Sequence, residues 1–175
     1  MGAPVTAGVA RVIGAMVEGK AELDAELGKQ VAGAIAKNFK VKPEEVAILR
    51  VTGGGKHMEF IVPARLAQVG SIPMTSTNSL AVRTARDKRA EAINNFGAAQ
   101  HPTVFEAVRL AKGESSEPIQ KIISVPILVG GHSAGVIQVS RKGKNPASAG
   151  PDFTQKDVEE LTQVAAALAG CFQPK

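Results

Sequence analysis

The stretch from Ile122 to Val139, IISVPILVGGHSAGVIQV, constrains the fold more than any other part of the chain. Its flanks are rich in Ile, Val and Leu, and the segment 130–135 between them contains three glycines. β-Branched runs on either side of a glycine-rich segment predict a β-hairpin with a longer loop. Because the runs are almost continuously apolar, we expect both faces of the sheet to be covered. Pro126 lacks an amide hydrogen, so it predicts a bulge or an incompletely paired side.

The other periodicities along the chain predict further helices and strands. The expected helices span 9–17, 23–38, 63–69, 79–86 and 101–112, and the expected strands span 46–52, 56–62, 90–96, 118–129 and 135–140. A final helix is expected after Thr154, which can form a capping box with Asp157. Phe153 and Val158 are placed as a hydrophobic staple around that cap. This order predicts an α+β fold, in which an antiparallel-dominated sheet carries the terminal helices on one face and a crossover on the other.

Length and charge limit what the chain can do. At 175 residues with 44% hydrophobic residues, it suits one globular domain with a core of its own. The formal net charge is +5, but there is no dense Lys/Arg run and no Trp or Tyr for base stacking. Nucleic acid is therefore not an expected partner. Solvated surface charge is the expected role of the basic residues Arg83, Arg86, Lys88, Arg89, Arg141, Lys142 and Lys144.

The chain has a single cysteine, Cys171, which excludes an intrachain disulfide and a multi-cysteine metal or redox centre. The three histidines are scattered, so we expect neither a metal site nor a Ser–His–Asp arrangement. Val5–Val17 is mildly apolar, but Arg11 interrupts it and it is too short to span a bilayer. A reduced, cytoplasmic location away from membranes is expected.

These features together resemble a GAF domain, the small-molecule sensor module. The hairpin SVPILVGGHSAGVIQVSRK is similar to the family's small-residue, Val-Pro-Ile, then Gly-Val-Ile pattern, and residues 152–157 are similar to its final helix start. The resemblance runs from about Leu23 to the C-terminus. It implies a GAF/PAS-like sheet with terminal helices on one face, and a ligand pocket enclosed by the crossover from Arg65 to Leu110. We therefore expect one domain over 21–175, preceded by a helical extension over 1–20.

The chain lacks sequence features that several functional classes of this family require. GAF photoreceptors carry a pocket cysteine that bonds a bilin, whereas Cys171 ends the final helix, so no bilin attachment is expected. The family's free-methionine-sulfoxide reductases use several cysteines and this chain has one, so the chain is not expected to be an enzyme. The cyclic-nucleotide signature requires Asn-Lys, whereas Lys144-Asn145 stands in reversed order, so cyclic GMP is not supported.

Polar residues of the crossover are the candidate ligand-binding residues, because a few convergent polar groups on apolar walls suit a small-molecule site. They are Thr77, Ser79, Arg83, Asn94, Asn95 and His101. Arg83 could pair with an anionic ligand, or it could be a surface arginine on an amphipathic helix. The two asparagines could instead end a strand by bonding backbone, and His101 could be a capping residue.

The leading hypothesis is a non-catalytic GAF-type sensor in signal transduction that binds an unidentified small molecule. It would pass a change through its terminal helices to a second subunit, as a homodimer, or to a separate output protein. The alternative is a dimerising scaffold or protein-interaction module whose pocket is filled by its own side chains. A cavity with Arg83 or Asn95 pointing inward would favour the sensor, and a filled interior would favour the scaffold.

Overall fold

The structure, a computed structural model, describes residues 5–63, 66, 70–77, 79–96 and 118–172. Within these residues six strands form one antiparallel sheet in the order β3-β2-β1-β6-β5-β4. The strands are β1 (Val46–Thr52), β2 (His57–Val62), β3 (Ile72–Pro73), β4 (Glu91–Ile93), β5 (Ile119–Val129) and β6 (His132–Lys142). The helices are α1 (Val5–Val17), α2 (Ala25–Phe39), α3 (Leu80–Asp87), α5 (Pro146–Ala149) and α6 (Gln155–Leu168), with 3₁₀ helices η1 (Pro43–Glu45) and η4 (Ala169–Phe172).

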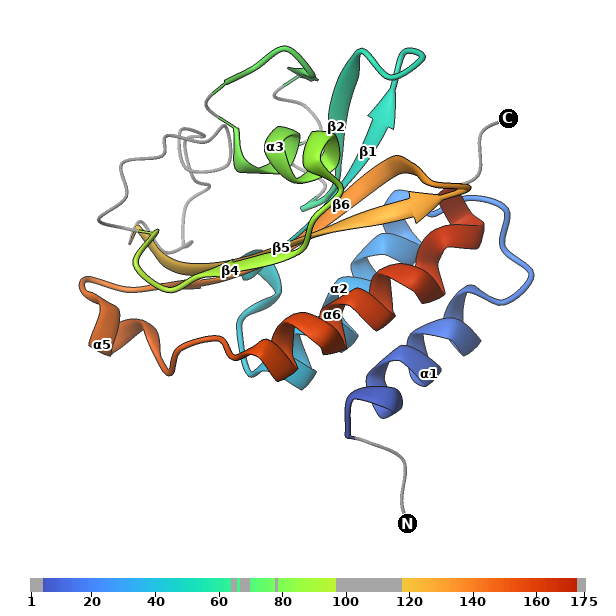
Figure 1. The fold of residues 1–175 in the computed structure, drawn as a ribbon. Helices are drawn as coiled ribbons and strands as arrows, with labels where there is room; N and C mark the ends of the chain where they lie inside the picture. Colours follow the sequence, from blue (N-terminus) through green and yellow to red (C-terminus); the bar gives the residue numbers. More distant parts are fainter. Residues whose placement is uncertain (1–4, 64–65, 67–69, 78, 97–117, 173–175) are drawn as a thin grey trace.

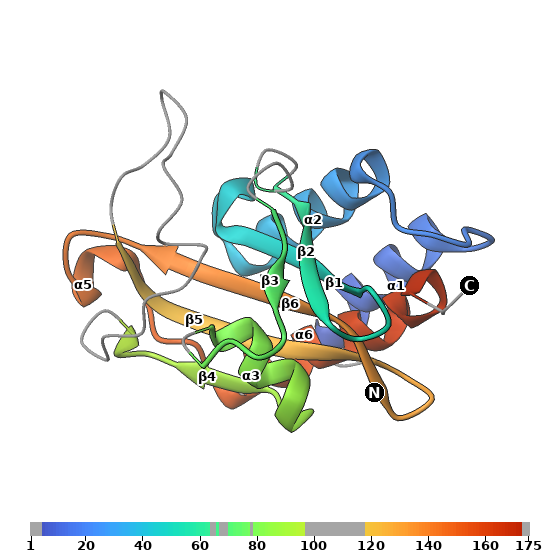
Figure 2. The ribbon, with the colours of Figure 1, turned by 90° about the horizontal axis from the view of Figure 1, so that it is seen from above.

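The elements form layers around the sheet, as Figures 1 and 2 show. The helices α2 and α6 lie along one face, α1 packs against α6, and α3 covers the opposite face. This arrangement confirms the predicted α+β fold with terminal helices on one face. The helix expected at 101–112, and most of the one expected at 63–69, lie outside the described residues.

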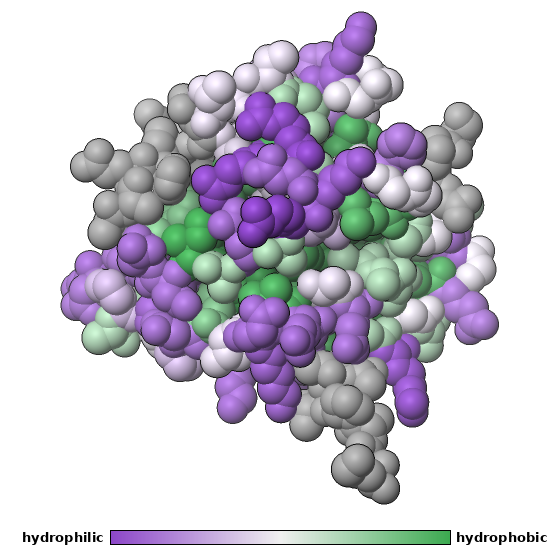
Figure 3. All heavy atoms as spheres, viewed as in Figure 1, coloured by the Kyte–Doolittle hydropathy of each residue, from purple (hydrophilic) through white to green (hydrophobic). Residues whose placement is uncertain are grey.

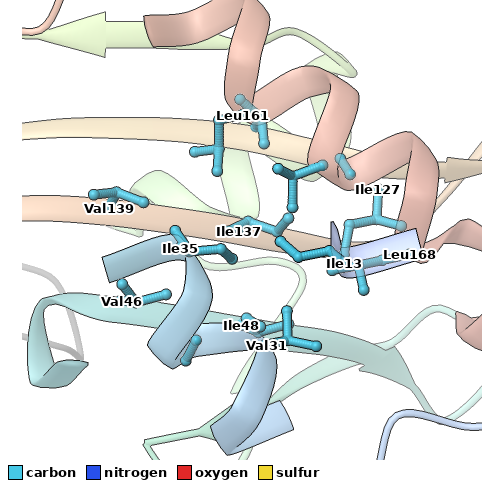
Figure 4. Close-up of a cluster of buried hydrophobic side chains, with 14 of the residues drawn as sticks. Ile13, Val31, Ile35, Val46, Ile48, Ile127, Ile137, Val139, Leu161 and Leu168 are labelled. Carbon is cyan, nitrogen blue, oxygen red and sulfur yellow. The ribbon is translucent and has the colours of Figure 1, made fainter. Parts of the chain in front are cut away.

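The larger core lies between the sheet and the terminal helices (Figure 4). Alternate residues of β6, such as Ile137 and Val139, face Ile35 of α2 and Leu161 of α6. Ile13 of α1 is fully buried in the same core. The N-terminal helix therefore packs with the rest of the domain, while the expected domain boundary at 20 stays a prediction.

A second, smaller core lies on the α3 face. Val136 of β6 and Ile122 of β5 pack there with Leu49 of β1 and Val82 of α3. Because neighbouring strand residues point to opposite faces, the continuous apolar runs supply both cores at once. The expectation that both faces of the central hairpin are covered is confirmed.

The central hairpin turns more tightly than expected. Val129 pairs directly with His132, which leaves a two-residue turn of Gly130 and Gly131 with φ values of 58° and 83°. Two positive φ angles in a two-residue loop are what a type I′ turn requires, and its twist matches that of the strands. The expected longer loop over 130–135 is therefore wrong, because β6 begins at His132.

Pro126 shows why the hairpin tolerates a proline in its centre. Pro126 stands opposite Val136 on β6, but β4 pairs only with residues 122–124 of β5. The side of β5 away from β6 therefore has no partner strand at Pro126 among the described residues. The prediction of an incompletely paired side is confirmed.

The start of α6 is as expected. Thr154 Oγ1 accepts from the Asp157 amide at 3.1 Å, and Asp157 Oδ2 accepts from the Thr154 amide at 2.8 Å. Phe153 and Val158 are both buried in the larger core, in the positions of a hydrophobic staple. The capping box and staple together fix where the helix begins.

Two further elements differ from the expectation in length or type. The loop expected over 143–151 contains α5, because Asn145 caps it and Pro146 suits its first position. The strand expected over 90–96 is reduced to β4, because the side chain of Asn94 binds the backbone of Phe153 instead of continuing the sheet.

We predict that Gly135→Ala is strongly destabilising. A Cβ at Gly135 would lie 2.4 Å from the Leu49 carbonyl oxygen and 2.8 Å from Phe172 Cε2. The expected loss is about 2–4 kcal/mol of unfolding free energy, measured by denaturant titration. The control is Gly33→Ala in α2, where a Cβ meets no described atom within 4 Å. Equal stability of the two variants would contradict the close approach.

Candidate functional site

The five candidate ligand residues that the structure describes differ in their surroundings. Thr77 and Asn95 are exposed, and His101 lies outside the described residues. Ser79 is buried and caps α3, because its Oγ accepts from the Val82 amide at 3.3 Å. Its hydroxyl is thereby committed to the helix start.

Arg83 lies on α3 and contacts the edge strand. Its Nη2 donates to Glu91 Oε1 of β4 at 2.8 Å, and the two side chains are 38% and 39% exposed. An ion pair with this exposure contributes little to stability by itself. Its position is more informative, because it joins the helix on one face of the sheet to the sheet's edge.

A hollow of about 240 Å³ opens at this ion pair. Its lining residues are Arg83, Thr84, Asp87, Arg89 and Glu91. Of the candidate residues that the structure describes, Arg83 is the one that lines this hollow. The guanidinium groups of Arg83 and Arg89 can hold a carboxylate or phosphate. The carboxylates of Asp87 and Glu91 line the same hollow and can compete with such an anion for them.

A buried polar chain leads inward from the hollow. Thr84 Oγ1 lies 2.7 Å from Ser124 Oγ, and Gln138 Nε2 donates to Ser124 Oγ at 3.2 Å. Ser124 and Gln138 stand opposite each other on β5 and β6. All three side chains are buried within the α3-side core. Sequence reasoning did not include them in the site, although both strand residues interrupt otherwise apolar runs.

The outer surface of α3 is hydrophilic (Figure 3). Purple side chains gather over α3, where Arg86, Asp87 and the C-cap residue Lys88 are exposed. Its inner residues, Leu80, Ala81 and Val82, pack on the sheet. The helix is therefore a cover with an apolar underside and a charged exterior.

Asn94 makes a reciprocal contact far along the sequence. Its Nδ2 donates to the Phe153 carbonyl at 3.0 Å, and its Oδ1 accepts from the Phe153 amide at 2.8 Å. Phe153 directly precedes Thr154, the cap of α6. Asn94 thus attaches the end of β4 to the start of the C-terminal helix.

Two buried cations hold the same segment. Lys121 Nζ donates to the Gly150 carbonyl at 2.5 Å and lies 2.8 Å from Asp152 Oδ1. The Arg141 guanidinium lies 4.5 Å from the centre of the Phe153 ring. Burial lowers the pKa of Arg141, while the charges of Asp157 and Glu45 oppose that shift.

Cys171 is buried and its Sγ donates to the Lys20 carbonyl at 3.6 Å. Burial raises the pKa of this thiol, and the charge of Arg50 opposes the shift. Cys171 lines a larger hollow of about 530 Å³ between α1 and η4, and the other lining residues are mostly small.

Across the described ranges, no group of three or more His, Cys, Asp or Glu could hold a metal ion.

A comparison with protein families matches the description "GAF domain" over residues 26–172, which is most of the chain. This chain belongs to the GAF domain family. The family is a general class of sensor and regulatory modules, and its members generally bind small molecules. The resemblance inferred from the sequence is confirmed.

Solved structures share the fold at low identity. The GAF domain of an Acinetobacter phosphoenolpyruvate-protein phosphotransferase is 15% identical with a TM-score of 0.71, covering 98% of this chain and 94% of that one. Free methionine-R-sulfoxide reductase from Neisseria meningitidis is 14% identical with a TM-score of 0.67, covering 98% and 92%. Residues 122 to 287 of a methyl-accepting chemotaxis protein are 18% identical with a TM-score of 0.57, covering 93% of each chain. A comparison with curated proteins finds no match.

The expectation that this GAF domain is not an enzyme is wrong. It rested on the lone cysteine and the lack of a familiar catalytic arrangement, but structures with this fold include an enzyme, the Neisseria reductase. The fold therefore does not exclude catalysis.

No helix within the described residues is long and apolar enough to cross a membrane.

We predict that Cys171 reacts slowly in the folded domain. Its burial and raised pKa both reduce the thiolate available at neutral pH. Alkylation by iodoacetamide, followed by mass spectrometry, should be about 100-fold slower than in denaturant. A rate close to that of the denatured chain would contradict the burial of Cys171 and its contact with the Lys20 carbonyl.

Proposed function

We propose that this GAF domain is a small-molecule sensor whose ligand is anionic and binds in the hollow beside α3. The observation that carries this proposal is the meeting of Arg83 and Thr84 in one hollow, above a buried polar chain. Polar groups converging at the edge of an apolar core are typical of small-ligand sites. The ligand roles of Thr77, Ser79, Asn94, Asn95 and His101 stay predictions.

The chemistry of the lining favours a carboxylate or phosphate. The guanidinium of Arg83 offers several donors in one plane, which suits two oxygens of one anion. Arg89 lines the same hollow, so a second cation stands close by. Thr84 lines the hollow as well, and its hydroxyl is hydrogen-bonded to Ser124 of the buried polar chain.

Binding would be read out through the terminal helices. These helices pack on the face opposite α3, so a sensor of this design must connect the two faces of the sheet. We propose that the receiver is a second copy of the chain or a separate output protein, in a reduced, cytoplasmic setting. Val12 of α1 has an apolar side chain that is 54% exposed, and it is the position at which a helix-mediated homodimer can be tested.

The test of the ligand is native mass spectrometry followed by identification of any released molecule. Affinity for that molecule should fall about tenfold or more in Arg83→Ala, because a charge-assisted hydrogen bond is lost. The control is Arg86→Ala, since Arg86 is exposed on the same helix and does not line the hollow. Equal affinity of the two variants would refute binding at Arg83.

The second candidate function is a dimerising scaffold or interaction module without a ligand. The observation that favours it is the filled α3-side core, where Leu66, Val82 and Phe96 are almost fully buried. An empty protein in native mass spectrometry, with no thermal shift from carboxylates or phosphates, would favour the scaffold over the sensor.

The homodimer has its own test. Val12→Asp should weaken self-association about tenfold or more in sedimentation equilibrium, because it places a charge in an apolar contact. The control is Leu128→Asp, which changes another exposed apolar residue, near the tip of the hairpin. An effect of Leu128→Asp alone would place the contact at the hairpin instead of α1.

A further inference from the structure

We infer that Glu91 is an internal competitor for the anion that Arg83 binds, and that Asn94 relays the release of Glu91 to α6. This inference rests on the proposed function, because it describes how the same hollow is regulated. It assigns a role in switching to two side chains, the carboxylate of Glu91 and the amide of Asn94. Their contacts support it in three steps.

The first step is the ion pair at the hollow. Arg83 holds Glu91 at 2.8 Å, and both line the hollow, so an incoming anion and Glu91 would use the same guanidinium. The pair is partly exposed, and pairs of this kind are weak. A ligand anion could therefore displace Glu91 at small cost.

The second step is the position of β4. This strand has three residues, stands last in the sheet order and pairs with β5 on one side. Figures 1 and 2 show it at the edge of the sheet, where it can reach the α3 face and the helical face. A short edge strand has few ladder hydrogen bonds, so even a weak pair such as Arg83–Glu91 can change how firmly it is held.

The third step is the attachment to α6. Asn94 follows β4 directly and holds the Phe153 amide and carbonyl. Lys121 of β5 and Arg141 of β6 also hold the segment Gly150–Phe153. Of these three anchoring side chains, Asn94 is the one attached to the strand that Arg83 contacts.

The two states then differ in the partner of Arg83. In one state Arg83 binds Glu91, and Asn94 holds the start of α6. In the other, Arg83 binds the anion and β4 loosens together with Asn94. Because the ligand interacts with Arg83 in only one state, it has the differential affinity that a population shift requires.

The test uses Glu91→Gln in the full chain without ligand. This substitution keeps the size of the side chain and removes the charge that Arg83 holds. Hydrogen exchange at the amides of Phe153, Asp157 and Val158 should rise about threefold or more. Exchange at these amides reports directly on the Asn94 contact and on the start of α6, because each amide donates to Asn94 or Thr154.

The relay is tested by repeating Glu91→Gln in an Asn94→Ala background. Exchange at Asp157 and Val158 should then show no further rise, because the connection is already broken. The matched controls are Asn95→Ala, an exposed neighbour, and Glu59→Gln, an exposed carboxylate on β2. Should Asn94→Ala fail to fold, Asn94→Asp keeps the acceptor for the Phe153 amide and loses the donor.

Two outcomes would overturn the inference. One is unchanged exchange at these amides in Glu91→Gln, and the other is an equal rise whether or not Asn94 is present. Because the experiment needs no ligand, it is independent of the proposed function. A protein that shows the relay but binds no anion would refute the sensor and the competitor role of Glu91, and would leave the contact from β4 to α6 intact. Anion binding without the relay would refute the role of Asn94 and leave the sensor intact.

Discussion

The pairing of β5 with β6 is the interaction on which the rest of the structure depends. It spans almost the whole of both strands and is closed by a two-glycine turn. One register places Val125 and Ile137 opposite each other on the helical face, and Ser124 and Gln138 opposite each other on the α3 face. A shift of one residue would exchange the two faces and place the polar pair inside the larger core.

The two faces handle polarity in different ways. On the α3 face, neutral hydroxyl and amide groups satisfy one another next to an open hollow. On the helical face, Lys121 and Arg141 are buried side by side, and they bind carbonyl oxygens, an acid and an aromatic ring. Buried cations are tolerated only where such partners surround them. The cationic end of the sheet therefore fixes α6, while the α3 face carries the hollow at which we propose that a ligand binds.

Local sequence signals predicted the fold well, whereas features that depend on contacts between distant residues could not be predicted from the sequence. The α6 cap was predictable because Thr154 and Asp157 are three residues apart. The length of the hairpin turn was not predictable, because the sequence places Gly135 in a glycine-rich segment typical of turns. In the structure Gly135 lies in β6, and its lack of a side chain allows the close approach of β1. Of the candidate site, the position of Arg83 on an amphipathic helix was predictable. The partners of Asn94 were not, because Phe153 is 59 residues away.

The shortness of the outer strands has a consequence for how the protein behaves at high concentration. Exposed strand edges offer unpaired backbone groups on which other chains can add, which leads to aggregation. Within the part of the chain that the structure describes, the sheet ends in β3 with two residues, one of them Pro73, and in β4 with three. Proline cannot donate to a neighbouring strand, and two or three residues offer little template. Among the described residues, β3 and β4 therefore offer little template for a growing intermolecular sheet, and Pro126 removes an amide donor from β5 where β4 no longer pairs with it.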